Sequence, residues 1–138
     1  MSYDLMVFEK SKAPAVRKEF MVWYEKQTEW SEEHDYQTIS VASPSLKNWF
    51  MEMIEKFPPM NGKYTPNLDP FDESEAEDLE RHSVDYSIGR DMIYAAFSWS
   101  VAEEAYEQMR SLAQKHGVGF FDVSGEKSEI ILPDGTMI

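Results

Sequence analysis

The side chains most able to bind a partner are the carboxylates of one short segment. From Asp69 to Glu80 the chain carries seven Asp and Glu and no Lys or Arg in twelve residues. The whole chain is acidic as well, because 26 Asp and Glu against 13 Lys and Arg give a formal net charge of −13. A field of this sign repels nucleic acids and anionic lipids and attracts basic surfaces. The sequence therefore predicts a basic protein partner, with no binding to nucleic acid or membrane.

We expect the partner-binding surface to consist of these carboxylates and one aromatic anchor. The candidates are Asp72, Glu73, Glu75, Glu77, Asp78, Glu80 and Trp30. Trp30 follows a predicted amphipathic helix and lies near Glu29 and Glu32, which favours an exposed position. The alternative interpretation is that the acidic segment is a solvated loop that keeps the protein soluble. Calcium is not expected, because the spacing of an EF-hand loop is missing.

No pattern of a catalytic or metal site is present in the sequence. The chain has no cysteine, which excludes disulfides, thiol catalysis and thiolate metal sites. The three histidines, His34, His82 and His116, fall outside the HExxH spacing of zinc enzymes. No serine lies in a GxSxG context. We therefore predict no catalytic residue, no metal and no cofactor.

A second interpretation is a small-molecule-binding protein or an enzyme that uses a pocket or an open sheet face. Its polar residues would be Tyr86, Arg90, His116 and Asp122, which the sequence alone does not place together. A concave pocket with two converging polar side chains would favour this interpretation. A solid core with a flat acidic face would favour the partner-binding protein.

The elements that must position these residues follow from hydrophobic spacing. We expect strands at 3–8, 84–88, 92–99, 118–123 and 129–132, and helices that begin near residues 14, 43 and 100. Ser43 and Pro44 are a typical N-cap and first helical residue. Ser100 and Glu103 form a capping box, and Gly117 ends that helix. Gly89-Arg90 matches a two-residue hairpin turn.

The resulting order, β-α-α-β-β-α-β-β, predicts an α+β fold with the ferredoxin-like split β-α-β plan. We expect a mainly antiparallel sheet with the helices on one face. Right-handed crossovers place the apolar strands 3–8 and 92–99 in its middle, with Trp99 at the end of a buried strand. One domain covers residues 1–138, and residues 60–81 form a long acidic loop.

The sequence also indicates in which cellular compartment the protein is found. No apolar run approaches the roughly 20 residues that a membrane span needs. The start, MSYDLMVFEK, lacks the basic residues of a signal peptide. We expect a cytoplasmic protein that is a monomer or a homodimer.

Several segments resemble an uncharacterised family of small acidic bacterial proteins. They are MSYDLMVFE, WFMEMIEKFPPMNG, DYSIGRDMIYAAFSWS and HGVGFFDVS, and they cover most of the chain outside the acidic segment. This resemblance implies no functional residues. The chain is more loosely similar to the immunity proteins of bacterial toxin systems, which are small, acidic, single-domain proteins without a catalytic signature. That similarity implies a protein that neutralises a basic toxin by occluding its active cleft.

Overall fold

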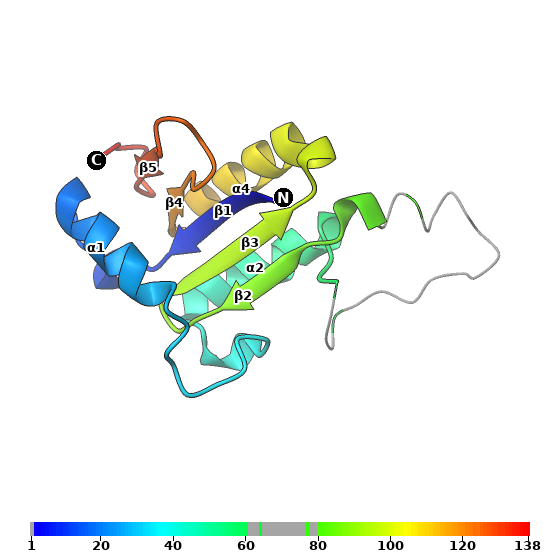
Figure 1. Cartoon of the computed structure of the whole chain (residues 1–138), viewed down its shortest axis with the longest axis horizontal. Helices are drawn as coiled ribbons and strands as arrows, with labels where there is room; N and C mark the ends of the chain where they lie inside the picture. The colour runs from blue at the N-terminus through cyan, green and yellow to red at the C-terminus, as the bar shows by residue number, and fades with distance from the viewer. Residues whose placement is uncertain (1, 61–63, 65–76, 78–79) are drawn as a thin grey trace.

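In the computed structural model, which describes residues 2–60, 64, 77 and 80–138, five strands form one antiparallel sheet (Figure 1). The strands are β1 (Tyr3–Phe8), β2 (Asp85–Ile88), β3 (Met92–Phe97), β4 (Gly119–Phe121) and β5 (Ile130–Ile131), in the order β2-β3-β1-β4-β5. The longer helices are α1 (Arg17–Gln27), α2 (Pro44–Lys56) and α4 (Ala102–His116). Short 3-10 helices span Lys10–Lys12, Ile39–Val41 and Trp99–Val101.

The two apolar strands lie side by side in the middle of the sheet, which confirms the prediction from their composition. β1 pairs with β3 from Tyr3↔Phe97 to Phe8↔Met92, and it pairs with β4 on its other edge. Leu5 to Phe8 are fully buried. A strand that is covered on both faces needs a nearly continuous apolar run rather than alternation, and β1 has one.

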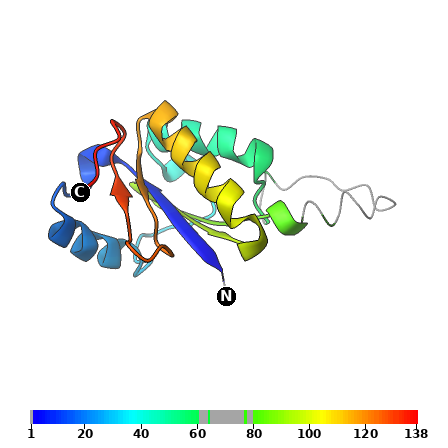
Figure 2. The ribbon, with the colours of Figure 1, turned by 90° about the horizontal axis from the view of Figure 1, so that it is seen from above.

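The helices divide between the two faces of the sheet. Helices α2 and α4 pack in one core cluster with the face that carries Leu5 and Val7. Helix α1 lies against the opposite face (Figure 2), where Phe20 packs against Phe8 with ring centroids 4.9 Å apart. The expectation of helices on one face is therefore wrong for α1. The physical reason is that Met6 and Phe8 are apolar and point to the face opposite α2 and α4, so another element must shield them from water.

Two of the predicted helix ends are confirmed and one is wrong. Ser43 Oγ accepts a hydrogen bond from the Leu46 N–H at 3.4 Å, and Gly117 ends α4 with φ +70°. The capping box at Ser100 does not form, because a 3-10 turn intervenes between β3 and α4. Ser98 caps that turn, and Val101 is the N-cap of α4.

The hairpin between β2 and β3 turns one residue later than predicted. Gly89 N donates to Met92 O at 2.8 Å, so Arg90 and Asp91 form the turn. Gly89 lies close to another segment, since a Cβ there would be 3.0 Å from Glu32 Oε2 and that side chain would have to shift slightly. That carboxylate also accepts the Arg90 N–H at 3.1 Å and so ties the 30–36 segment to the hairpin.

Most of the predicted acidic loop at 60–81 lies outside the described residues. Where it is described, Met60 N donates to Val84 O at 3.0 Å, and the Tyr64 ring packs against Phe50. Glu77, Glu80 and Arg81 are helical, so the predicted loop is not irregular at these three positions. In the described part of the chain, no helix is both long and apolar enough to cross a membrane.

We predict that Gly119→Ala destabilises the sheet. A Cβ at this position would overlap the ring of Phe8, which is fully buried between the sheet and α1. Overpacking of this kind costs about 1–3 kcal/mol. Urea unfolding should show that loss, whereas Ser111→Ala on the exposed side of α4 should change stability by no more than about 0.5 kcal/mol. Equal stabilities for the two variants would contradict the packing described for β1.

Candidate functional site

The predicted partner-binding residues fall in three places. Asp72, Glu73, Glu75 and Asp78 lie outside the described residues. Glu77 and Glu80 are exposed on the helical segment that leads into β2. Trp30 is 39% exposed and packs on the sheet face opposite α2 and α4, against Tyr94. The structure therefore places Trp30 on a different surface from Glu77 and Glu80.

Exposed carboxylates gather where β3 ends and α4 begins, and we call this surface the acidic end. Its residues are Glu77, Glu80, Asp85, Glu103, Glu104 and Glu107. Two contacts bring them together from separate elements. Asp85 pairs with Ala96 near the end of β3, and His82 Nε2 lies 3.0 Å from Glu104 Oε2 at the start of α4. Figure 1 shows these segments at the same end of the sheet as the N-terminus.

The helix dipole of α4 and a hydrogen bond from His82 favour negative charge at the acidic end. Glu103 and Glu104 lie in the first turn of α4, where the helix dipole favours negative charge. The hydrogen bond from His82 holds the pKa of Glu104 below its ordinary value, with smaller contributions from Lys56 and Arg81. The Glu104 carboxylate thus remains ionised at neutral pH.

An exposed tryptophan lies at the same end. Trp99 is 52% exposed, and its ring packs against Tyr3 with centroids 5.0 Å apart. The prediction that Trp99 belongs to a buried strand is wrong, because β3 ends at Phe97 and the chain enters the 3-10 turn. The flanking Ser98 and Ser100 are the sequence signal that could have shown this. Tryptophan is enriched among residues that dominate binding energy at protein interfaces.

A shallow groove of about 390 Å³ lies beside Trp99. It is lined by Tyr3, Ala102, Glu103, Tyr106 and Glu107. The tyrosines come from β1 and α4, and the Tyr106 ring packs on Phe120 of β4 at 5.3 Å. A second shallow groove continues along α4 from Tyr106 and Glu107 to Gln114. The grooves therefore combine aromatic rings with carboxylates.

Asp122 is the buried charged residue of this region. It is 9% exposed, and its Oδ1 has no hydrogen-bond partner within the described part of the chain. Burial raises the pKa of Asp122, Glu129 raises it further, and the Gly125 backbone N–H partly offsets both. In turn the Asp122 charge adds to the effect of burial in raising the pKa of Tyr3 and of Tyr106. Alternation along β4 places Asp122 on the same sheet face as Phe120, on whose ring Tyr106 packs.

The four residues of the small-molecule interpretation do not form one site. Tyr86 is buried and its hydroxyl donates to Phe57 O at 2.7 Å. Arg90 is exposed in the β2–β3 turn, and His116 at the end of α4 lies 3.0 Å from Glu52. Strands β3 and β1 separate β2 from β4, after which Asp122 follows.

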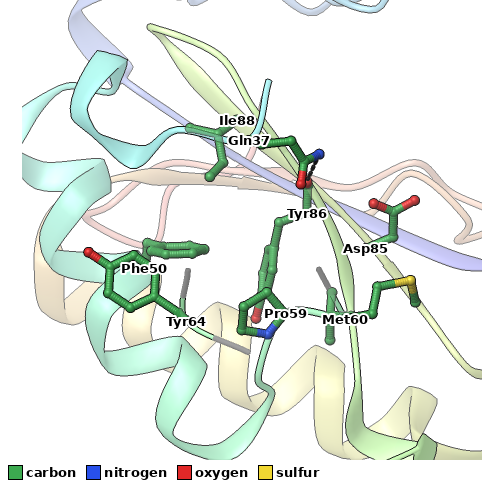
Figure 3. Close-up of a pocket in the computed structure, with 9 residues that line it drawn as sticks. Gln37, Phe50, Pro59, Met60, Tyr64, Asp85, Tyr86 and Ile88 are labelled. Carbon is green, nitrogen blue, oxygen red and sulfur yellow. Dashed lines mark hydrogen bonds between the residues drawn. The ribbon is translucent and has the colours of Figure 1, made fainter. Parts of the chain in front are cut away.

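A small cavity at the edge of β2 does not fit a substrate. Its volume is about 20 Å³, and Figure 3 shows the side chains around it. Gln37 Nε2 donates to the Tyr86 carbonyl oxygen across it at 3.5 Å. A space of this size holds about one water molecule. Tyr86 and Gln37 therefore close the edge of the sheet rather than form a binding pocket.

The sheet face that α1 covers in part, which we call the open sheet face, carries a separate polar cluster. The Tyr94 hydroxyl donates to Asp4 Oδ2 at 2.5 Å, and Trp30 packs edge-on against Tyr94 at 5.8 Å. Trp30 and Tyr36 have φ values of +55° and +59°, which bulky residues rarely adopt. The Ile88 N–H holds Tyr36 by donating to its carbonyl at 2.8 Å. Ring packing against Tyr36 and Tyr94 holds Trp30 over the sheet despite this backbone strain.

Comparison with protein-family models, with curated proteins and with solved structures finds no match to this chain. Among the residues that the structure describes, no group of three or more His, Asp or Glu is arranged to hold a metal ion. The functional inference therefore depends on the chemistry of the acidic end, the groove and the open sheet face.

We predict that Asp122→Asn stabilises the protein at neutral pH. A raised pKa means that the native state binds the proton more tightly than the unfolded chain does. The native state therefore loses stability as pH rises from the pKa of aspartate in the unfolded chain, about 3.9, through the higher pKa of Asp122 in the folded protein. Because Asn does not ionise, the melting temperature of the variant minus that of the wild type should be larger at pH 7 than at pH 4.

The matched control is Asp134→Asn. A hydrogen bond from the Thr136 backbone lowers the pKa of the exposed Asp134, so its stabilising effect is present above the unfolded pKa and lost as pH falls. Its replacement should lower the melting temperature slightly at pH 7 and less at low pH. The account of Asp122 fails if its variant shows no dependence on pH, or the same sign as Asp134→Asn.

Proposed function

We propose that the protein binds a basic protein partner through the acidic end. The observation that carries this proposal is the exposed Trp99 beside the carboxylates of that surface, on a chain with a net charge of −13. Complementary charge speeds and orients association, and a partly exposed tryptophan supplies an apolar anchor. Glu77 and Glu80 belong to this surface in the proposal, and Asp72, Glu73, Glu75 and Asp78, which lie outside the described residues, stay predicted partner-binding residues.

The partner class that we propose is a bacterial toxin with a basic active cleft. A nuclease is the most concrete case, because its cleft binds phosphates and a row of fixed carboxylates can take their place. The protein would then act as an immunity protein in the bacterial cytoplasm and occlude the cleft. Its role would require neither a catalytic residue nor a cofactor of its own.

We also propose that the fold is a ferredoxin-like split β-α-β unit with additions. The strand order β2-β3-β1-β4, the antiparallel pairing, and the position of α2 and α4 on one face support this assignment. Helix α1 and strand β5 would be the additions. In this plan the β3–α4 connection, which carries Trp99, lies at one end of the sheet and stays free to meet a partner.

A second candidate function is small-molecule binding on the open sheet face. The observation that favours it is the Tyr94–Asp4 hydrogen bond beneath Trp30. Burial, aided by Asp4, raises the pKa of Tyr94, so its hydroxyl remains protonated at neutral pH. Such a group donates hydrogen bonds and orients a ligand; it does not act as a base.

Neutralising part of the acidic segment should slow association with the partner. We would replace Glu73, Glu75, Glu77 and Asp78 by Gln or Asn, and measure association by biolayer interferometry with the partner that the wild-type protein captures from its source organism. Association should slow at least several-fold at low salt. The difference should shrink as salt rises, because surface charges are screened over about 8 Å at physiological ionic strength.

The matched control replaces four exposed glutamates on and just after α1 by Gln. They are Glu19, Glu25, Glu29 and Glu33. It removes the same charge from a different surface. If both quadruple variants slow association equally, net charge and not the acidic segment governs binding. If the acidic-segment variant binds at the wild-type rate at every ionic strength, the proposed function is wrong.

Replacing the two exposed tryptophans should separate the two candidate functions. Trp99→Ala should weaken partner binding at least about tenfold, as expected when an interface anchor is removed. Trp30→Ala should leave that affinity within about twofold, because Trp30 lies on the open sheet face. Equilibrium titration of both variants measures this. The opposite ranking would favour the open face as the binding surface.

A further inference from the structure

We propose that the groove beside Trp99 binds a cationic side chain, a guanidinium or an ammonium, which a basic protein partner inserts, with Asp122 as its counter-ion. This inference rests on the proposed basic partner and names the chemical group that the partner presents. It also assigns a binding role to Asp122, Tyr3 and Tyr106, which lie away from the acidic segment in the sequence.

The groove has the chemistry that a cation needs. Tyr3 and Tyr106 line it with aromatic rings, and Trp99 extends this surface because it packs against Tyr3 at 5.0 Å. Glu103 and Glu107 are exposed and contribute carboxylates to the same lining. Aromatic faces attract a cation through their quadrupole, and carboxylates attract it through charge. Their combination favours a side chain with an apolar stem and a charged head.

Asp122 supplies an independent sign that a ligand belongs here. Its side chain is nine-tenths buried, yet Oδ1 has no hydrogen-bond partner among the described residues. An unsatisfied buried carboxylate is costly, and either a proton or a cation removes that cost. Asp122 N donates to Glu129 O at 2.9 Å, so the β4–β5 pairing continues past Phe121. Side chains alternate along a strand, so Asp122 lies on the same sheet face as Phe120, against which the Tyr106 ring of the groove packs at 5.3 Å.

The protein's own cations leave Asp122 uncompensated. Arg110 is the neighbouring guanidinium, but its Nη1 donates to the Tyr106 hydroxyl at 3.4 Å and its charge lies over the Tyr106 ring at 5.9 Å. The charges that influence Asp122 include Glu129, which is negative, and no described cation offsets them. The contact of Arg110 also shows that the Tyr106 ring accepts a guanidinium.

Two other ligands fit less well. A metal ion would need three or more suitable ligands, and the described residues offer no such group. A nucleic acid or another anion would meet Glu103, Glu107 and the uncompensated Asp122 and would be repelled. A free polyamine shares the ammonium chemistry of a lysine, and the experiment separates these two sources.

The test is an NMR titration of the isotope-labelled protein with N-acetyl-arginine amide. The same titration with N-acetyl-citrulline amide is the control, since citrulline has nearly the same shape and no charge. The arginine compound should cause saturable shifts at Tyr3, Ala102, Tyr106 and the Trp99 indole. The citrulline compound should cause shifts at least tenfold smaller at the same concentration.

Asp122→Asn should weaken binding of the arginine compound at least tenfold. Its matched control is Asp91→Asn, because burial also raises the pKa of Asp91, which lies in the β2–β3 turn away from the groove. Asp91→Asn should bind as the wild type does. The melting temperature of each variant, measured at the titration pH, shows that any loss of binding is not a loss of folding.

Three results would overturn the inference. One is shifts spread over all exposed carboxylates without saturation in the groove. Another is unchanged affinity in Asp122→Asn. The third is spermidine binding to the same residues at least tenfold more tightly than the arginine compound, which would assign the groove to a free polyamine. None of these uses the partner, so the groove can fail while charge-dependent association with the partner still supports the proposed function.

Discussion

The burial of β1 on both faces is the constraint on which the rest of the structure depends. Leu5 to Phe8 are fully buried, so α2 and α4 must cover one face of the sheet while α1 covers the other. The end of β1 at Tyr3 remains at the margin of this core, beside the β3–α4 connection. The acidic end and the groove lie there because the packing of β1 leaves that margin open.

Several features work against the stability of the free protein. The chain carries a net charge of −13, so its carboxylates repel one another, and the buried Asp122 adds an unpaired carboxylate oxygen at the edge of the core. Glu103, Glu104 and Glu107 add further charge within two turns of α4. A basic partner would relieve all of these together, since its charge would offset the repulsion and its side chain would compensate Asp122. The features that favour binding thus lower the stability of the free protein, and binding of the partner would remove that cost.

Much of the fold could be predicted from hydrophobic spacing, because a buried strand such as Tyr3–Phe8 and a capped helix such as α2 are encoded locally. Spacing does not state which face of a sheet a helix covers, so it does not place α1. It does not reveal the exposure of Trp99 either, because an aromatic residue that ends an apolar run resembles a core residue. The position of Asp122 on the sheet face that α4 covers depends on the long-range pairing of β1, β4 and β5.

The most direct test of the central claim is the pKa of the Asp122 side chain, measured by carbon-13 NMR in the free protein and in the presence of the bound cation or partner. The account predicts a pKa above the ordinary range for aspartate in the free protein, because burial disfavours the charged form. It predicts a fall in that pKa on binding, because a nearby cation favours the carboxylate. An ordinary value in the free protein, or a raised value that binding leaves unchanged, would contradict the account.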